Sequence, residues 1–274
     1  MIIHAYIYTY NVARILDYSL RYYSRFCDKI FVYDNGSTDN TKEICAKYEK
    51  ACHVPYNTDT VCLYYDEQIL VDKKSTDYKQ SRGKADWAII VDTDELLYHP
   101  DLLNILQRYK DSGIKLATTI ENFIVFNGWP QDPDLFKNTF YLRSKSVGKC
   151  ILVDPSYTIS YGVGCHTTIT ENSKIISQTG NSLEDLNKLV ETDGISRPEL
   201  YFIHFKILDI PFLTMNFRDL NSRRSPRMIK NGWGYHYNQI DNCIRDLQKI
   251  VARGVTSLDG YRIVLEVPVE FPNR

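Results

Sequence analysis

The chain contains 274 residues, of which 43% are hydrophobic and 24% charged, so it can bury a sizeable core. Its 33 basic and 34 acidic side chains give a formal net charge of -1, which excludes a global attraction to nucleic acid or to an anionic membrane. The seven cysteines show no paired spacing, which argues against a zinc module or a disulfide framework. The sequence shows neither a leader pattern nor an apolar run of membrane-spanning length, so we expect a soluble, cytoplasmic protein.

Strand and helix periodicities alternate through residues 1–120. An apolar run typical of a strand covers 2–8, helically spaced apolar side chains follow over 12–26, and 29–34 again has the pattern of a strand. This order predicts parallel strands joined by a right-handed crossover. Further strands are expected at 61–66, 87–94 and 114–120, with helices beginning near Asn40 and after His99.

After residue 121 the pattern changes to shorter, more alternating strands separated by glycine and proline. We therefore predict the α/β class, with a Rossmann-like, mostly parallel central sheet flanked by helices and a smaller mixed or antiparallel extension. No flexible linker divides the chain, so we expect one compact domain in two halves, 1–120 and 121–274. The second half is expected to contain strands at 138–145, 149–153, 157–170 and 199–207, and helices at 182–190 and 239–251.

Several predicted strands of the first half end on acidic residues. In open α/β sheets ligands bind outside the carboxyl ends of the strands. Asp92 and Asp94 end a continuous apolar run, and in an extended segment their carboxylates would point the same way. Because like charges repel, this pair predicts a hard divalent cation, Mg2+ or Mn2+, with a solvated loop as the alternative. For Asp66 and Glu67, an exposed polar strand end is an equally good interpretation.

The segment VYDNGSTDNTKEI, residues 32–44, carries more polar turn-forming residues than a simple loop needs. Asp34 at a strand end would accept a hydrogen bond from a nucleotide base or a ribose hydroxyl, and Gly36 would let the backbone approach a flat ligand. An ordinary helix N-cap loop is the alternative. Thr9 and Tyr10, at the end of the first strand, would complete a base pocket.

Together, YIYTYNVARIL, FVYDNGSTDNT and WAIIVDTDELL resemble the N-terminal half of GT-A fold glycosyltransferases, in particular the family-2-like enzymes with a DxD motif. The resemblance implies a metal-dependent enzyme that moves a sugar from a UDP-sugar donor to a hydroxyl group of a glycan or glycoprotein acceptor. It places Asp34 near the uracil, and Asp92 and Asp94 at the ribose, the metal and the diphosphate. The donor-binding residues expected are Tyr8, Thr9, Tyr10, Asp34, Arg82, Lys84, Asp92 and Thr93.

Downstream residues supply candidates for a third metal ligand and a catalytic base. His204 lies in a strand similar to one that carries a metal-binding histidine in several GT-A families, and His166 is the alternative. A histidine ligand would favour Mn2+ over Mg2+. Besides Asp94 at the metal, Glu121 and Asp132 are the candidates for the general base of an inverting enzyme. The basic residues Arg218, Arg223, Arg224 and Arg227 would either lie on a loop that closes over a diphosphate or form an ordinary solvated surface, and both interpretations fit equally well. Trp129 and Trp233 would either stack on a sugar or anchor turns.

Two other functions fit parts of the sequence. IIVDTDEL resembles the motif of haloacid-dehalogenase phosphohydrolases, but Leu96 stands where threonine or valine is expected, and that motif normally lies on a first strand. The absence of a clean base motif also leaves a non-catalytic nucleotide-sugar binder as an alternative. The Tyr-rich sequence is similar, in addition, to soluble glycosyltransferases of large algal viruses, which would place the protein in a bacterial or virus-infected host cytosol.

Overall fold

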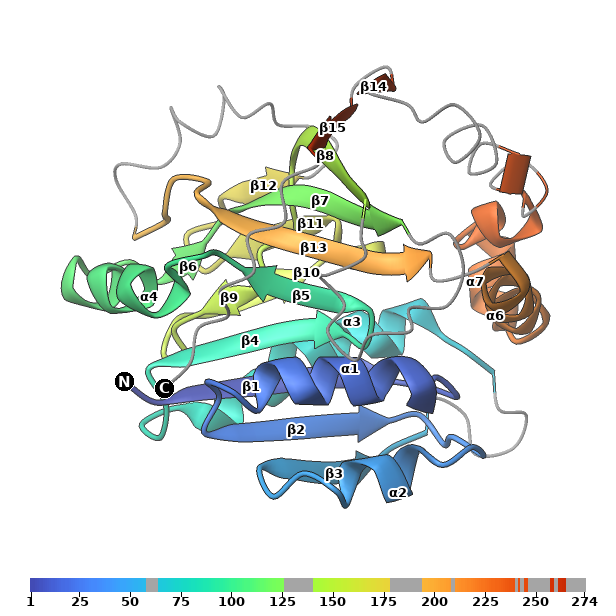
Figure 1. Ribbon diagram of the computed structural model, residues 1–274, viewed down its shortest axis with the longest axis horizontal. Coiled ribbons are helices and arrows are strands. Elements are labelled where there is room, and N and C mark those ends of the chain that lie inside the picture. The colour runs from blue at the N-terminus through green and yellow to red at the C-terminus, as the bar shows by residue number, and fades with distance from the viewer. Residues whose placement is uncertain are drawn as a thin grey trace.

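The computed structural model describes most of the chain. A mostly parallel sheet occupies the lower half of the view in Figure 1, and a second, mixed sheet lies above it. This is the α/β class with a mostly parallel central sheet that the sequence predicts, and that prediction is confirmed. The described residues are 1–57, 64–125, 140–177, 194–207, 210–239, 241, 244–245, 257–258 and 261–264.

The first sheet consists of β1 (Ile3–Thr9), β2 (Lys29–Asp34), β3 (Ala51–Pro55), β4 (Trp87–Asp92), β6 (Leu116–Ala117) and β9 (Leu152–Val153). Its strand order is β3-β2-β1-β4-β9-β6. The first four strands in this order run parallel, whereas β9 runs antiparallel to both of its neighbours. The chain thus moves outward from β1 in both directions, as in a doubly wound sheet.

The described helices are α1 (Ala13–Tyr23), α2 (Thr41–Cys45), α3 (Glu67–Thr76), α4 (Leu102–Asp111), α6 (Ile210–Ser222) and α7 (Pro226–Lys230), with the short 3-10 helices η1 (Asp77–Ser81), η3 (Val163–Cys165) and η4 (Tyr235–Gln239). Ile7 of β1 packs with Leu16 of α1 in one core cluster, and Tyr8 of β1 packs with Val71 of α3 in another. Successive side chains of a strand point to opposite faces, so α1 and α3 cover opposite faces of the sheet. Burial of both faces explains why every residue of β1 is buried and most of them are apolar or aromatic. None of the described helices is long and apolar enough to cross a membrane.

The second sheet runs β14-β15-β8-β7-β13-β5, with β5 (Glu95–Tyr98), β7 (Thr119–Val125), β8 (Phe140–Val147), β13 (Leu200–Ile207), β14 (Ser257–Leu258) and β15 (Tyr261–Val264). β13 pairs parallel with β7 and antiparallel with β5. A third, three-stranded antiparallel sheet contains β10 (Ile159–Tyr161), β11 (Thr167–Thr170) and β12 (Ile175–Ser177). The mixed and antiparallel extension is therefore present, and β13 confirms the strand predicted at 199–207.

The predicted third strand is wrong in position. The strand that pairs with β2 on its outer side is β3. Residues 64–66, which are the described part of the segment 61–66, lead into helix α3. Asp66 caps this helix, because its Oδ1 accepts the backbone N–H groups of Gln68 and Ile69 at 3.0 and 3.3 Å. Asp66 is therefore the start of a helix, and residues 64–66 form no strand of the sheet. The helices predicted at 182–190 and, for the most part, at 239–251 lie outside the described residues.

The strand predicted at 114–120 is divided between two sheets. Leu116 and Ala117 form β6 of the first sheet, and from Thr119 the chain enters β7 of the second. In return, β9 from the second half of the chain pairs with β4 in the first sheet. The first sheet is thus not made from residues 1–120 alone. The expectation that 1–120 binds the donor, and that 121–274 forms the acceptor side with a third metal ligand, stays a prediction.

Gly148, which follows β8, allows the close approach of three chain segments. A Cβ atom there would overlap Thr119 Oγ1 and come within 3.0 Å of Phe202 Cβ. We expect Gly148→Ala to lower the free energy of unfolding by about 1–3 kcal/mol, because overpacking forces buried neighbours to move. Gly162→Ala is the matched control, since the nearest atom there, Thr167 Cβ, would lie at 3.4 Å, an ordinary contact. Urea unfolding checks this, and equal midpoints for the two variants would contradict it.

Candidate active site

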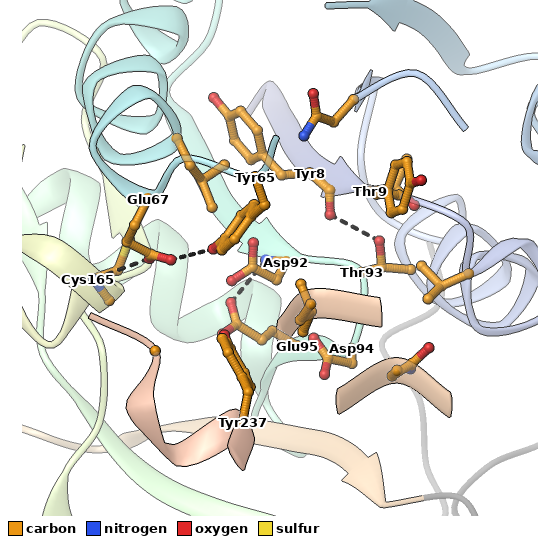
Figure 2. A pocket seen from close by; sticks show the side chains of 18 of the residues that line it. Tyr8, Thr9, Tyr65, Glu67, Asp92, Thr93, Asp94, Glu95, Cys165 and Tyr237 are labelled. Carbon is orange, nitrogen blue, oxygen red and sulfur yellow. Dashed lines mark hydrogen bonds between the residues drawn. The ribbon is translucent and has the colours of Figure 1, made fainter. Parts of the chain in front are cut away.

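A cavity of about 620 Å³ lies at the carboxyl ends of β1 and β4. This is the edge of a doubly wound sheet where ligands bind, and the volume lies in the range of small-molecule sites. Figure 2 shows Tyr8 and Thr9 on one side, Asp92 near the centre and Tyr237 opposite. The C-terminal elements from α6 to η4 contribute Asn216, Asp219, Leu220, Arg223, Gly232, Trp233, Gly234, Tyr235 and Tyr237 to the lining.

Two lysines hold the carboxylates at the end of β4. Lys74 Nζ lies 2.7 Å from Asp92 Oδ1, and Lys149 Nζ lies 3.8 Å from Asp92 Oδ2. Lys149 pairs more closely with Glu95, at 2.6 Å from Oε1, while Glu95 Oε2 accepts the backbone N–H of Asp92 at 2.8 Å. Both lysines and Glu95 are buried, whereas 32% of the Asp92 side chain is exposed. The four groups form a cluster of two positive and two negative charges at the cavity, whose lining includes Asp92, Glu95 and Lys149.

The pairing outweighs the effect of burial on the protonation of this cluster. Burial acts to raise the pKa of Glu95, but the ammonium groups of Lys149 and Lys74 lower it from 4.5 to about 2. Burial likewise acts to lower the pKa of Lys74, and the Asp92 carboxylate raises it instead. The pKa of Lys149 is raised in the same way by Glu95 and Asp92. Glu95 and both lysines are therefore charged at neutral pH.

Asp94 faces His204 across the junction of the two sheets. β5 pairs with β13 in a register that places Glu95 opposite His204, and the Phe205 N–H donates to the Asp94 carbonyl oxygen at 2.9 Å. This register brings His204 Nε2 to 3.2 Å from Asp94 Oδ2, although the two residues are 110 positions apart. Both side chains line the cavity and are partly exposed. A carboxylate and an imidazole thus meet at the same edge as Asp92.

The extended conformation predicted for 92–94 is wrong. β4 ends at Asp92, and the chain turns at Thr93 and Asp94 before β5 begins. Lys74 and Lys149 also neutralise Asp92, so repulsion between Asp92 and Asp94 does not by itself require a cation. Within the described part of the chain, no group of three His, Cys, Asp or Glu side chains is arranged to hold a metal ion. Asp94 and His204 remain as a pair of potential ligands.

Thr93 and Thr9 have different roles at the strand ends. Thr93 Oγ1 donates to the Tyr8 carbonyl oxygen at 2.9 Å, and the Ser19 hydroxyl of α1 donates to the Thr93 carbonyl oxygen, so Thr93 ties β4 to β1 and α1. Thr9 lines the cavity and is only 5% exposed, and its hydroxyl has no hydrogen-bond partner among the described residues. Leaving a buried hydroxyl unpaired is costly. A polar ligand group in the cavity would satisfy it.

Asp34 is buried beside the cavity rather than in its lining. Its Oδ1 accepts the Ser37 N–H at 2.8 Å, and its Oδ2 lies 2.8 Å from His53 Nε2. The turn after β2 is therefore held from within, and the adjacent Asn35 is the residue of this loop that lines the cavity. Tyr10 also lines it, with the Arg223 guanidinium 3.4 Å from the centre of its ring.

The structure brings some of the remaining predicted residues together and leaves others elsewhere. Glu121 and His166 line the cavity with Arg223 and Trp233. Arg82 and Lys84 do not, and Arg82 donates to the Pro155 carbonyl at 2.9 Å. Among the described residues, the cations of the lining are Lys149 and Arg223, and Lys74 lies behind Asp92. Of the other predicted arginines, Arg218 is exposed, Arg224 donates to the Trp233 carbonyl and Arg227 pairs with Asp66. Asp132 and Trp129 lie outside the described residues.

Sequence reasoning missed Lys74 and Lys149, and the exposed strand end that it gave as one interpretation of Glu67 is wrong, because Glu67 is a buried residue of α3 that lines the cavity. α3 buries positions 67, 70, 71, 74 and 75, a helical stripe that includes Glu67 and Lys74. A lysine on such a stripe is itself a signal, because a buried ammonium requires a carboxylate partner. Glu67 accepts hydrogen bonds from the Tyr65 hydroxyl and, at 3.1 Å, from the Gly164 N–H (Figure 2). Lys149 is a single basic residue before a short strand, and nothing in its local sequence marks it.

No protein-family model matches the chain, and no curated protein matches its sequence. Among solved structures, glucosyl-3-phosphoglycerate synthase from Mycobacterium tuberculosis, in complex with Mn2+, UDP and glucosyl-3-phosphoglycerate, aligns at 16% identity and a TM-score of 0.32, over 44% of this chain and 44% of that one. TarS of S. aureus aligns at 12% identity and a TM-score of 0.40, over 93% and 44% of the two chains. A 4-diphosphocytidyl-2C-methyl-D-erythritol synthase from Anaerococcus prevotii aligns at 13% identity and a TM-score of 0.33, over 57% and 70%. The chain spans less than half the length of the first two proteins, so its function has to be inferred from its own site.

The buried pair of Glu95 and Lys149 predicts a loss of stability in acid. Because the pKa of Glu95 is lower in the folded than in the unfolded chain, its contribution is complete above pH 4.5 and is lost as the pH falls towards 2. We expect Glu95→Gln to cost about 3–5 kcal/mol at pH 7, since it leaves Lys149 buried without its closest partner. The variant should also lose less stability than wild type between pH 5 and 2. Chemical unfolding across this range checks both points, and parallel pH profiles would contradict them.

Proposed function

We propose that the protein is a glycosyltransferase that uses a divalent cation to transfer a sugar from a UDP-sugar to an acceptor hydroxyl. The observation that carries this proposal is the pair of Asp94 and His204, which opens into a cavity at the carboxyl ends of β1 and β4. A nucleotide would lie along this edge, as ligands do in doubly wound sheets. The partial resemblance of the N-terminal half to GT-A fold enzymes supports the same reaction class.

Asp94 and His204 fit the requirements of a divalent cation. Two ligands that each lie about 2.1 Å from one ion, at right angles, are about 3 Å apart, and the observed separation of Oδ2 and Nε2 is 3.2 Å. Mg2+ and Mn2+ are commonly held by one or two side chains together with phosphate oxygens of the substrate, and the imidazole favours Mn2+. When bound, the cation would supply positive charge to the departing diphosphate.

The residues around this pair would bind and orient the donor. Tyr8, Tyr10 and Asn35 would contact the base or the ribose, and the unpaired hydroxyl of Thr9 would bond to a polar group of the nucleotide. Asp92 keeps part of its surface exposed while Lys74 and Lys149 hold it in place, so it would accept a hydrogen bond from a ribose or sugar hydroxyl. These contacts would fix the anomeric carbon relative to the acceptor.

Glu121 is the described candidate for the base that takes the proton of the acceptor hydroxyl. Its side chain is buried and lines the cavity on the side of the second sheet. This is where a carboxylate would face an acceptor, if the first half of the chain binds the donor. Asp132 remains the other candidate. Lys149 and His204, which belong to the second half, would also serve the donor.

The proposal predicts binding of UDP that depends on Mn2+. In calorimetric titrations we expect wild type to bind UDP with Mn2+ present, and Asp94→Asn and His204→Gln to weaken binding roughly tenfold or more, because each removes a ligand. Asp111→Asn, at the exposed end of α4, is the matched control and should bind as wild type does. Absence of UDP binding with either Mn2+ or Mg2+ would refute the donor site.

Turnover separates an enzyme from a binder. We expect Mn2+-dependent release of UDP from a UDP-sugar, followed by NMR across a panel of donors, and a strong decrease of this rate in Glu121→Gln with UDP affinity unchanged. Binding of UDP without any release would instead support the non-catalytic alternative.

A further inference from the structure

Glu67 is a buried carboxylate of the cavity to which the reaction described above gives no role. It is the first residue of α3, it is only 8% exposed, and it belongs to the lining. Resting on the function proposed above, we propose that Glu67 binds a hydroxyl group of the transferred sugar. Its negative charge selects neutral sugars and excludes uronic acids as donors.

The protein gives Glu67 neutral partners. The Tyr65 hydroxyl donates to Oε2, and the Gly164 N–H donates to Oε1 at 3.1 Å (Figure 2). Within the described residues no basic side chain forms an ion pair with Glu67, and the two buried lysines pair with Asp92 and Glu95 instead. A buried carboxylate needs a cation or a full set of hydrogen bonds. Each of its oxygens can accept a further hydrogen bond, and a ligand in the cavity can donate it.

The segment that meets Glu67 has an uncommon backbone conformation. Gly164 and Cys165 have φ angles of 76° and 56°, which lie in the left-handed region that residues other than glycine rarely adopt. The His166 ring packs against Gly164, where a Cβ atom would come within 2.6 Å of its Cδ2. Strained backbone of this kind is concentrated at ligand sites. All three residues line the cavity, so they form one polar wall together with Glu67.

Glu67 lies where the sugar of a bound donor would extend. In Figure 2, Thr9 and Asp94 lie on one side of Asp92, and Glu67 lies on the other. The nucleotide and its diphosphate are assigned to the side of Thr9 and Asp94, so the sugar continues past Asp92. The pKa of Tyr237 is raised by burial and then by the charges of Glu67, Asp92 and Asp94, so all three carboxylates act on one hydroxyl group of the lining. A donor that spans the cavity would thus reach Glu67 with its sugar.

A carboxylate without a counterion distinguishes sugars by their charge. A sugar hydroxyl would donate to Glu67, and hydrogen bonds to an ionised acceptor are stronger than those between neutral groups. The carboxylate of a uronic acid would instead repel Glu67, and such repulsion is weakly screened at a buried site. Asp92 is compensated by Lys74 and Lys149, so Glu67 is the uncompensated charge of this wall among the described residues.

Calorimetric titration of matched donor pairs, with Mn2+ present, tests this proposal. UDP-glucose differs from UDP-glucuronate only at C6, where an acid replaces a hydroxymethyl group, and UDP-galactose differs from UDP-galacturonate in the same way. We expect wild type to bind the neutral member of each pair roughly tenfold or more tightly than the acid, because of the charge of Glu67. Equal affinities within both pairs would overturn the proposal. This comparison needs no variant, so it decides the matter even if a substitution prevents folding.

Three variants assign the preference to Glu67. Glu67→Gln removes the charge and should reduce the preference to roughly threefold or less, with the affinity for UDP unchanged. Glu67→Asp keeps the charge and should keep the preference. Glu43→Gln, at an exposed position of α2, is the matched control and should bind as wild type does.

A full preference in a folded Glu67→Gln protein would show that another group excludes the acids, and would overturn the proposal. The outcome for UDP alone separates this inference from the function on which it rests. If wild type binds no UDP with Mn2+ or Mg2+, the proposed function fails and the inference fails with it. If wild type binds UDP but treats neutral and acidic donors alike, only the inference fails.

Discussion

The candidate site depends on the neutralisation of buried charge at the end of β4. Asp92 and Glu95 place two carboxylates at the junction of the two sheets, and Lys74 and Lys149 reach them from α3 and from the segment after β8. Without these cations, Glu95 would be a buried, unpaired anion in the centre of the protein. With them, the strand can end in a charged cluster that is rigid and well satisfied. The exposed edge of that cluster, with Asp94 and His204 beside it, forms the floor of the cavity.

The register between β5 and β13 turns this cluster into a site. A slip of one residue would point His204 away from Asp94, because successive side chains of a strand face opposite sides. Backbone pairing on both sides of β13 prevents the slip, since β5 opposes Glu95 to His204 and β7 opposes Phe123 to the same residue. The second sheet thus fixes the position of His204 relative to Asp94, whereas the first sheet provides the open edge at which a nucleotide would lie.

The parts of the fold that follow one simple period are predictable from the sequence. β1, β2, β4 and α1 are apolar runs or regular stripes, and the structure forms them close to the expected bounds. β3 escaped detection because Ala51–Pro55 is short and only partly buried, and α3 because its buried stripe contains Glu67 and Lys74. Asp92, Asp94 and His204 could be selected from the sequence, since Asp92 ends an apolar strand, Asp94 follows it by two residues and His204 lies within the apolar strand β13. The lysines that determine the state of Asp92 could not be paired with it, because such pairings arise only from the tertiary structure.

The origin of Lys149 has a consequence for how the chain acquires its structure. Glu95 and its closest counterion are 54 positions apart, and β9, which completes the neighbourhood of β4, also follows Lys149. During synthesis, the first four strands emerge from the ribosome while Glu95 still lacks that partner. The early βα units can collapse on their apolar faces, but burial of a charged Glu95 at the start of β5 is unfavourable until the later segment arrives. The order of the sequence thus delays completion of the charge cluster until Lys149 and β9 of the second half have been made, so a shorter chain would present the edge of the sheet without a working cluster of charges.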